Sequence, residues 1–208
     1  MGQSSYQILA EDAQGEIVVK KSRFLAHLTK VETEEEADAF VRSMKKQYWD
    51  ARHNCSAFVI GSQNEITRCS DDGEPSGTAG RPMLEVLTGS GLHDTAAVVT
   101  RYFGGVLLGT GGLVRAYQSA VKEALSNAHL LTMRLCVPLE IRIPYPCLDR
   151  VKGMLEREGA CLDIAYSEEV CIKAEVPAEK KDAVLAALVD ETSGAARCKA
   201  GDARMAAV

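Results

Sequence analysis

Two glycine-dense segments constrain this chain more than any other feature of its sequence. DDGEPSGTAGRP at 71–82 and RYFGGVLLGTGGLVRAY at 101–117 contain three and five of the 17 glycines, beside carboxylates, arginines and tyrosines. Glycine adds no side chain to a core and loses much backbone entropy on folding, so such segments are typical of special turns and close backbone approach. We therefore expect two loops that hold a ligand. The alternative, in which the glycines only permit turns and tight strand–helix packing, stays open.

The charge balance excludes proteins that bind nucleic acid through bulk positive charge. The 208 residues carry 24 Lys and Arg against 29 Asp and Glu, a formal net charge of −5. The first 132 residues hold 13 basic and 16 acidic residues, and the rest hold 11 and 13, so neither part is a basic module. Any contact with RNA must be local, and no pattern signals a preference for DNA.

Cysteine spacing and hydropathy indicate a reduced, cytoplasmic protein. The seven cysteines are an odd number without a CxxC pair, which argues against a zinc ribbon or a complete disulfide framework. The N-terminus lacks the pattern of a signal peptide, and no run approaches the ~18 apolar residues that a membrane span needs. We therefore expect no membrane partner.

Hydrophobic periodicity predicts strands and helices that alternate along the first part of the chain. A Thr33/Glu36 capping box opens a helix that runs to about Gln47, with Ala37 and Phe40 on its apolar face. The other expected elements are a strand or bent hairpin at 16–31, two strands within 53–70 around a turn at 61–64, a helix at 78–87, a strand at 95–103 and a helix at 112–130.

The pattern after residue 133 predicts a second domain. A strand, a helix, a strand pair, a helix and a weak final strand follow one another over about 134–208. This βαββαβ order is typical of a ferredoxin-like domain. The sequence thus predicts an α+β protein of two domains, 1–132 and 133–208, without a flexible linker of Pro, Gly or Ser.

The segment GTGGLVRAY, which starts at Gly109, has the features of an anion site. Backbone N–H groups and the positive end of a helix dipole lie beneath a loop that follows a strand. Arg115 lies early in that helix, and Arg101 is expected to reach the same anion from the strand end. The spacing matches neither GxGxxG nor a P-loop, so ATP and NAD are set aside. A phosphate or phosphodiester is the expected ligand.

Three carboxylates follow one another closely in the first glycine-dense segment. Asp71, Asp72 and Glu74 can hold a hard cation such as Mg²⁺ or share a proton. A solvated acidic turn explains them equally well. His53, between Arg52 and a predicted strand, is a candidate for proton transfer, although such a histidine is more often a structural hydrogen-bonding group.

A basic patch precedes Phe24 in the first predicted hairpin. Lys21 and Arg23 belong to KKSR at 20–23, a pattern that suits phosphate contact next to base stacking. A solvated strand end explains it equally well.

Four separated motifs resemble the YigZ/IMPACT family: KKSRFLA at 20–26, ARHNCSAF at 51–58, SDDGEPSGTAGRP at 70–82 and VVTRYFGGVLLGTGGLVRAY at 98–117. The C-terminal pattern is similar to the extra domain of bacterial members. The resemblance implies an N-terminal α/β domain of the ribosomal-protein second-domain-like type and a C-terminal domain similar to a ferredoxin-like module of elongation factor G. Both domain resemblances imply a role in translation and protein partners that act in translation. The mechanism of eukaryotic members, which carry an added RWD domain, is not transferred.

The resemblance assigns no reaction and no catalytic residue. It marks a shared surface made of Arg52, His53, Asp71, Asp72, Gly73, Glu74, Arg101, Tyr102, Gly104, Gly105, Gly109, Arg115 and Tyr117. The expected anion or nucleic-acid contacts are Lys21, Arg23, Arg52, Arg101, Tyr102, Gly104, Gly105, Gly109, Gly111, Gly112, Arg115 and Tyr117.

Three functional hypotheses follow. The first is a translation-related regulator that binds RNA or the ribosome through the glycine-rich anion site. The second is a metal-assisted phosphoester hydrolase, in which Asp71, Asp72 and Glu74 hold Mg²⁺ and His53 moves a proton. The third is a regulator that docks protein partners and holds no small ligand.

Overall fold

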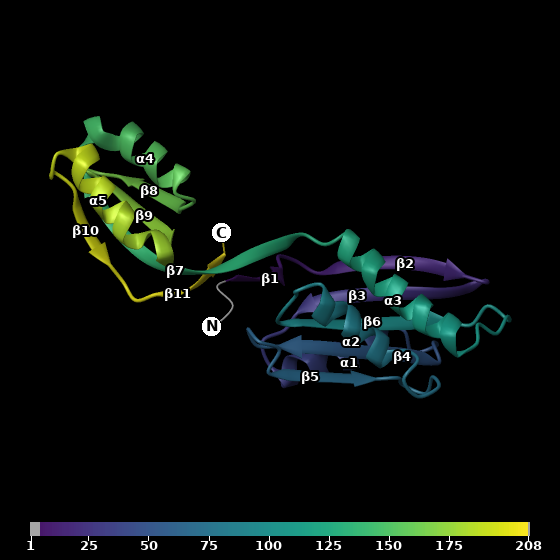
Figure 1. Cartoon of the computed structure of the whole chain (residues 1–208). Helices are drawn as coiled ribbons and strands as arrows, with labels where there is room; N and C mark the ends of the chain where they lie inside the picture. Colours follow the sequence, from purple (N-terminus) through teal and green to yellow (C-terminus); the bar gives the residue numbers. More distant parts are fainter. Residues whose placement is uncertain (1–4, 208) are drawn as a thin grey trace. The chain divides into compact units, whose positions relative to one another are not determined.

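The computed structural model describes residues 5–207, and their contacts divide into two compact units. One unit is Tyr6–Leu131, and the other contains Ser5 together with the residues from Thr132 onward. Helices and strands alternate in both units (Figure 1), which confirms the predicted α+β fold class. Among the described residues no helix is long and apolar enough to cross a membrane.

The N-terminal unit is built on an antiparallel sheet with the strand order β2-β3-β6-β4-β5. Its elements in chain order are β1 (Ser5–Leu9), β2 (Ala13–Val19), β3 (Ser22–Lys30), α1 (Glu34–Gln47), β4 (His53–Ile60), β5 (Ile66–Ser70), α2 (Gly80–Gly89), β6 (Thr95–Tyr102) and α3 (Thr110–Ser126). The segment 16–31 is therefore a hairpin, and α2 and α3 each begin at a glycine-dense segment.

Helices cover both faces of this sheet. Cys55, Ala57 and Val59 of β4 join the larger core under α2 and α3, whereas Phe58 and Ile60 join a smaller core under α1. This alternation follows from the two-residue side-chain period of a strand. In Figure 1, α3 lies along β2 and β3, so the helix that follows the second glycine-dense segment is anchored on the sheet.

The capping box of α1 forms at its predicted position. Thr33 Oγ1 accepts a hydrogen bond from the Glu36 N–H at 3.2 Å, and the Glu36 carboxylate accepts from the Glu32 N–H at 2.7 Å. These contacts satisfy N–H groups that the first helical turn leaves without partners. Local sequence is therefore sufficient to start this helix.

The C-terminal unit has the strand order β10-β7-β9-β8, all antiparallel. This is the order of a ferredoxin-like sheet, with α4 and α5 packed against one core. The elements are β7 (Leu130–Ile143), α4 (Leu148–Arg157), β8 (Cys161–Tyr166), β9 (Val170–Pro177), α5 (Lys181–Thr192), β10 (Arg197–Ala200) and β11 (Arg204–Ala207), with short 3-10 turns at Tyr145–Cys147 and Ala178–Lys180.

The predicted final strand is two strands, β10 and β11, which both pair with β7. The ladder stops between them at Pro138, which has no N–H to donate. Gly201 lies beside this point, donates its N–H to the Pro138 carbonyl at 2.9 Å, and has no room for a Cβ, which would lie 2.9 Å from Pro138 Cγ. Pro138 in the long strand β7 therefore divides the strand that pairs with it into β10 and β11.

Candidate functional site

Three of the four motifs meet as neighbouring strands at one end of the N-terminal sheet, and the fourth reaches Arg101 through Glu74. In the strand register Arg101 of β6 lies opposite His53 of β4 on one side and opposite Phe24 of β3 on the other. Tyr102 lies opposite Arg23. Residues that are far apart in the sequence are therefore cross-strand neighbours, which places their side chains within contact distance.

A hollow of ≈ 570 Å³ opens at this end of the sheet, and we call it the sheet-end hollow. It combines guanidinium, imidazole and aromatic groups with one carboxylate. Its lining consists of Asp50, Arg52, His53, Arg101, Tyr102, Phe103 and Leu107. The volume lies in the range of small-molecule sites, about 300–1,000 Å³.

Arg101 is the buried cation of this hollow. Its side chain is 8% exposed, and its Nη1 donates a hydrogen bond to Glu74 Oε1 at 2.6 Å, where the Glu74 side chain is 3% exposed. The guanidinium contacts two rings, with its carbon 5.5 Å from the centroid of Phe24 and 5.6 Å from that of Phe103. Such an arrangement compensates the buried charge and fixes the orientation of the side chain.

One edge of that guanidinium is not used by Glu74. The carboxylate takes Nη1, which leaves the edge formed by Nε and Nη2. Nε is buried, and no described residue accepts a hydrogen bond from it. Buried N–H groups of this kind are nearly always paired in native proteins, so this edge lacks a partner.

Glu74 also joins a buried network of neutral groups. The Tyr117 hydroxyl donates to Glu74 Oε1 at 2.8 Å, and the Cys55 sulfur lies 3.3 Å from that hydroxyl and 3.0 Å from the Asp71 carbonyl oxygen. Burial raises the pKa of Cys55 to about 12 and also raises the pKa of Tyr117. Both groups are therefore protonated at neutral pH, so this network positions Glu74 and holds no nucleophilic thiolate.

Asp71 organises the first glycine-dense segment. Its carboxylate accepts hydrogen bonds from the N–H groups of Gly77, Ala79 and Gly80, at 2.7, 3.0 and 2.8 Å. Partial burial alone would raise the pKa of Asp71, but these three donors together lower it. The side chain thus caps α2 from nine residues away, because Ala79 at the cap position has no side-chain acceptor.

Asp72 has a separate set of partners. Its carboxylate accepts from Lys45 Nζ at 2.5 Å and from the Asn54 N–H at 2.7 Å. Its backbone carbonyl lies 2.9 Å from His53 Nδ1. Since a carbonyl only accepts, Nδ1 is the nitrogen that donates, and Nε2 is left as the acceptor of this hollow-lining histidine.

The structure does not assemble the ligand set expected for Mg²⁺. The carboxylates of Asp71, Asp72 and Glu74 accept hydrogen bonds from three different sets of donors, although the residues are neighbours in the sequence. In residues 5–207 no group of three or more His, Cys, Asp or Glu side chains is arranged to hold a metal ion. Each of the three carboxylates is oriented by a different structural element.

Arg115 and Arg101, which the sequence predicts to hold the same anion, line different hollows. Arg115 lines a second hollow of ≈ 190 Å³, together with Lys20 and Gly112. The neighbours of Arg115 in α3, Ala116 and Tyr117, are buried, so Arg115 lies on the exposed side of the helix. Arg101 is instead held on the core side of β6 by Glu74.

The helix start at Gly109 keeps the expected geometry. Gly109 has φ 72°, and no side chain caps α3. Gly105 also has positive φ, in the left-handed region that glycine adopts most easily. Gly111 is exposed and Gly112 is partly buried. The chain segment that contains these glycines connects the sheet-end hollow with the hollow at Arg115.

Gly104 has a packing reason of its own. A Cβ on this residue would lie 2.0 Å from the carbonyl carbon of Lys21, and its N–H donates to Ser22 Oγ at 3.1 Å. Arg23 pairs with Glu16 at the surface. Lys21 and Arg23 therefore flank the site through the backbone and do not line the sheet-end hollow.

Sequence reasoning missed three lining residues. Asp50 accepts a hydrogen bond from the Tyr102 hydroxyl at 2.8 Å, and nothing in the local sequence marks it. Phe103 and Leu107 are 53% and 81% exposed. Large apolar residues inside a glycine-dense loop were a usable signal, because a loop has no core in which to bury them.

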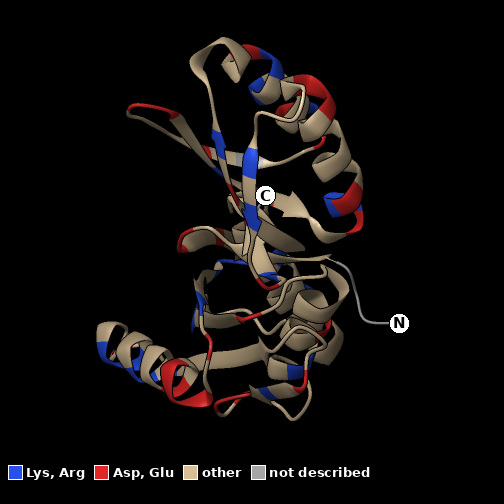
Figure 2. Ribbon diagram, turned by 90° about the vertical axis from the view of Figure 1, so that its left-hand side faces the viewer, with Lys and Arg blue, Asp and Glu red and all other residues tan. Residues whose placement is uncertain are grey.

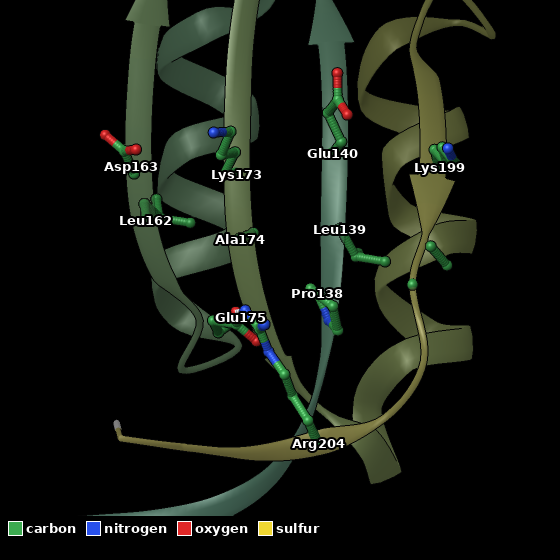
Figure 3. Close-up of a pocket in the computed structure, with 12 residues that line it drawn as sticks. Pro138, Leu139, Glu140, Leu162, Asp163, Lys173, Ala174, Glu175, Lys199 and Arg204 are labelled. Atoms are coloured by element: carbon green, nitrogen blue, oxygen red, sulfur yellow. Dashed lines mark hydrogen bonds and ion pairs between the residues drawn. The ribbon is translucent and has the colours of Figure 1, made fainter.

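Charges elsewhere are interspersed, as Figure 2 shows for both units. The C-terminal sheet carries a hollow of ≈ 540 Å³ on the face opposite α4 and α5 (Figure 3). Lys173 and Lys199 line it, and Arg204 and Glu175 pair at one end. Positive and negative groups alternate there, so this face has no single sign of charge.

Comparisons with known proteins connect both units to one group. The family described as Impact N-terminal domain matches residues 20–125. The chain is 44% identical over 199 residues to the IMPACT family member YvyE of Bacillus subtilis, which covers 95% of this chain and 92% of that protein. It is 41% identical over 182 residues to the IMPACT family member YigZ of Escherichia coli, which covers 85% and 88%.

A solved structure supports the same arrangement of elements. A crystal structure described as that of an hypothetical protein is 36% identical, covers 96% of this chain and 98% of its own, and has a TM-score of 0.62. The range matched by the family contains every residue that lines the sheet-end hollow.

Proposed function

Since the chain belongs to the IMPACT family, we propose that it is a translation-related regulator that contacts RNA or the ribosome through the sheet-end hollow. The observation that carries this proposal is the presence of Arg52, Arg101, Tyr102 and Phe103 in one hollow. Cationic groups beside aromatic rings suit a nucleic-acid strand, whose phosphates and bases need both. The resemblance to a ribosomal-protein-like fold and an elongation factor G module supports a role in translation.

The net charge sets the expected strength of this contact. With −5 overall, the protein has no long-range attraction for RNA, so the contact rests on a few phosphates. Each phosphate neutralised on a single strand contributes a slope of about −0.7 to the plot of log affinity against log salt concentration. We therefore expect binding that weakens with salt and has a shallow slope of about −1 to −2.

Co-sedimentation with ribosomes and with protein-free ribosomal RNA tests this proposal. Arg52→Ala removes an exposed cation from the hollow, and Arg81→Ala is the matched control, because Arg81 is 78% exposed and lies outside the hollow. We expect Arg52→Ala to weaken binding and Arg81→Ala to leave it unchanged. Absent binding at low salt, or equal loss in both variants, would contradict the proposal.

Metal-assisted phosphoester hydrolysis has weaker support. Asp71, Asp72 and Glu74 already accept hydrogen bonds from protein donors, so Mg²⁺ would have to displace them. The tautomer of His53, with an acceptor Nε2 at the hollow, is the feature that favours this alternative. Phosphoester turnover that needs Mg²⁺ and is lost in Asp72→Asn would establish it.

A further inference from the structure

The unpaired edge of Arg101 is the strongest sign of an absent ligand in the N-terminal unit. Nε of Arg101 is buried without a hydrogen-bond partner among the described residues, although the side chain lines the sheet-end hollow. A buried donor without an acceptor is costly, and native proteins seldom keep one without a reason. Nε has less than 1 Å² of accessible surface, so an acceptor that enters the hollow must displace a covering side chain to reach this edge and remove the cost.

The geometry of that edge selects an oxyanion. The N–H groups on Nε and Nη2 are parallel and match two oxygens of one phosphate or carboxylate. Glu74 holds Nη1, and the guanidinium carbon lies over the rings of Phe24 and Phe103 at 5.5 and 5.6 Å from their centroids. The edge is therefore fixed in place before any ligand arrives, which reduces the entropy lost on binding.

Charge alone does not make this a site for free phosphate. Arg52 and Arg101 are balanced by Asp50 and Glu74 among the charged residues that line or support the hollow. An anion therefore gains a fixed pair of donors and little net electrostatic attraction. The ligand needs a second group that gains from the hollow.

Phe103 supplies that second contact. Its ring lies on Arg101, yet 53% of the residue is exposed, and Leu107 beside it in the lining is 81% exposed. An aromatic ring with free surface stacks on any base, because every base has a π-face. A ligand that places a phosphate on Arg101 and a base on the neighbouring Phe103 ring is a nucleotide.

The depth of the site separates unpaired from paired nucleotides. Arg101 is 7% exposed and lines a ≈ 570 Å³ hollow, a volume suited to one ligand of nucleotide size. A duplex keeps its bases stacked inside and presents a convex backbone. Such a surface cannot bring a phosphate to a buried side chain, whereas an unpaired nucleotide can enter.

We propose that the sheet-end hollow takes one unpaired nucleotide, with its phosphate on the Nε–Nη2 edge of Arg101 and its base against Phe103. This inference rests on the proposed contact with RNA at the same site, and it adds that the RNA is single-stranded there. A free mononucleotide has the same chemistry, so the experiment must separate the two sources.

Fluorescence anisotropy of a short labelled oligoadenylate provides the test. The strand is titrated alone and annealed to oligouridylate, with AMP, adenosine and inorganic phosphate as competitors. We expect the single strand to bind at least about tenfold tighter than the duplex, as one stacked base contributes on that scale. AMP should displace the strand at lower concentration than adenosine or phosphate, because only AMP uses both contacts.

Two variants separate the two contacts. Phe103→Ala should weaken single-strand binding about tenfold, while Tyr166→Ala, which removes a 65% exposed tyrosine of the C-terminal unit, should not. Arg101→Lys keeps a cation for Glu74 and removes the bidentate edge. It should therefore abolish the advantage of AMP over adenosine, and its thermal unfolding shows whether the fold is kept. If Arg101→Lys does not fold, Phe103→Ala decides.

The outcomes distinguish this inference from the proposed function. RNA binding with equal affinity for both forms, or insensitive to Phe103→Ala, overturns the nucleotide site and leaves the RNA contact intact. Phe103-dependent binding of AMP without RNA binding keeps the nucleotide site, identifies the free nucleotide as its source and contradicts the RNA contact. Failure of AMP and both RNA forms to bind overturns both.

Discussion

The N-terminal unit buries both partners of a charged pair, whereas in the C-terminal sheet each pair keeps its arginine at the surface. Arg101 and Glu74 have side chains that are 8% and 3% exposed. In the C-terminal pairs each arginine side chain is more than half exposed, as in Arg142–Glu140, Arg197–Glu169 and Arg204–Glu175. Two units of one chain thus use the same residue types in opposite environments.

The difference shows which unit of this chain loses hydration energy by burying charged groups. Exposed pairs contribute little to stability, because water and salt screen them and two long side chains must be ordered. A buried pair needs compensation for lost hydration, and it constrains the position of both groups. We infer that the N-terminal unit tolerates Arg101 and Glu74 in its interior because they organise the sheet-end hollow, while the charges of the C-terminal unit form a solvated face.

Removing the buried acceptor should have the largest effect. Glu74→Ala leaves the buried Arg101 charge without its partner, and such a change costs about 3–5 kcal/mol. The free energy of unfolding from denaturant titration measures it, with Glu140→Ala as the control, since the Glu140 and Arg142 side chains are 43% and 58% exposed. Equal effects of both substitutions would remove the contrast between the units.

A methyl group at Gly104 should cost less but still be clearly measurable. The added Cβ would lie 2.0 Å from the Lys21 carbonyl carbon, so the loop and the β2–β3 turn must separate. Overpacking of this kind costs about 1–3 kcal/mol. Gly89→Ala is the matched control, because a Cβ there meets nothing within 4 Å and alanine favours a helix. A stable Gly104→Ala protein would show that this contact does not hold the loop.

Asp71 should make stability depend on pH. Its pKa is lowered from 3.8 in the folded protein, so its contribution is complete above pH 3.8 and is lost as the pH falls through the lower folded pKa. Asp71→Asn should destabilise by about 1 kcal/mol at neutral pH, the usual scale of a helix cap. Denaturant titrations over a pH series test this: the difference between the two proteins should shrink below pH 3.8, and a difference independent of pH would contradict the capping role.

The surface pair should have the smallest effect. Arg197→Ala removes a 72% exposed side chain that pairs with Glu169, and we expect a change of less than about 0.5 kcal/mol. Denaturant titration should give this small difference at low salt and a still smaller one at high salt, because salt screens the pair. A loss as large as that of Glu74→Ala would show that the C-terminal face also depends on its charges.

Local signals were sufficient for most elements of the fold. Thr33 and Glu36 form the predicted cap, and the βαββαβ order after residue 133 is confirmed. The break between β10 and β11 was not predicted, because it depends on Pro138 in the neighbouring strand β7. Strand pairing is a non-local property that a weak terminal segment does not reveal.

The sequence predicted which segments form the site, but not which side chains contact one another there. The segments around His53 and Arg101 do meet, but Arg101 is held by Glu74, 27 residues away, and Arg115 lines a different hollow. Asp71 serves α2 as a cap. Partner choice among buried charges depends on which groups the tertiary fold desolvates together, and residue spacing does not contain that information.

The side-chain Nε–H resonance of Arg101 tests the central claim most directly. In two-dimensional ¹⁵N–¹H NMR, titration with AMP and with single-stranded oligoadenylate should shift this resonance strongly, because the phosphate becomes its acceptor. The Nε–H resonance of exposed Arg81 should stay in place. Saturating either ligand without any change at Arg101 would contradict the assignment of the sheet-end hollow as the binding site.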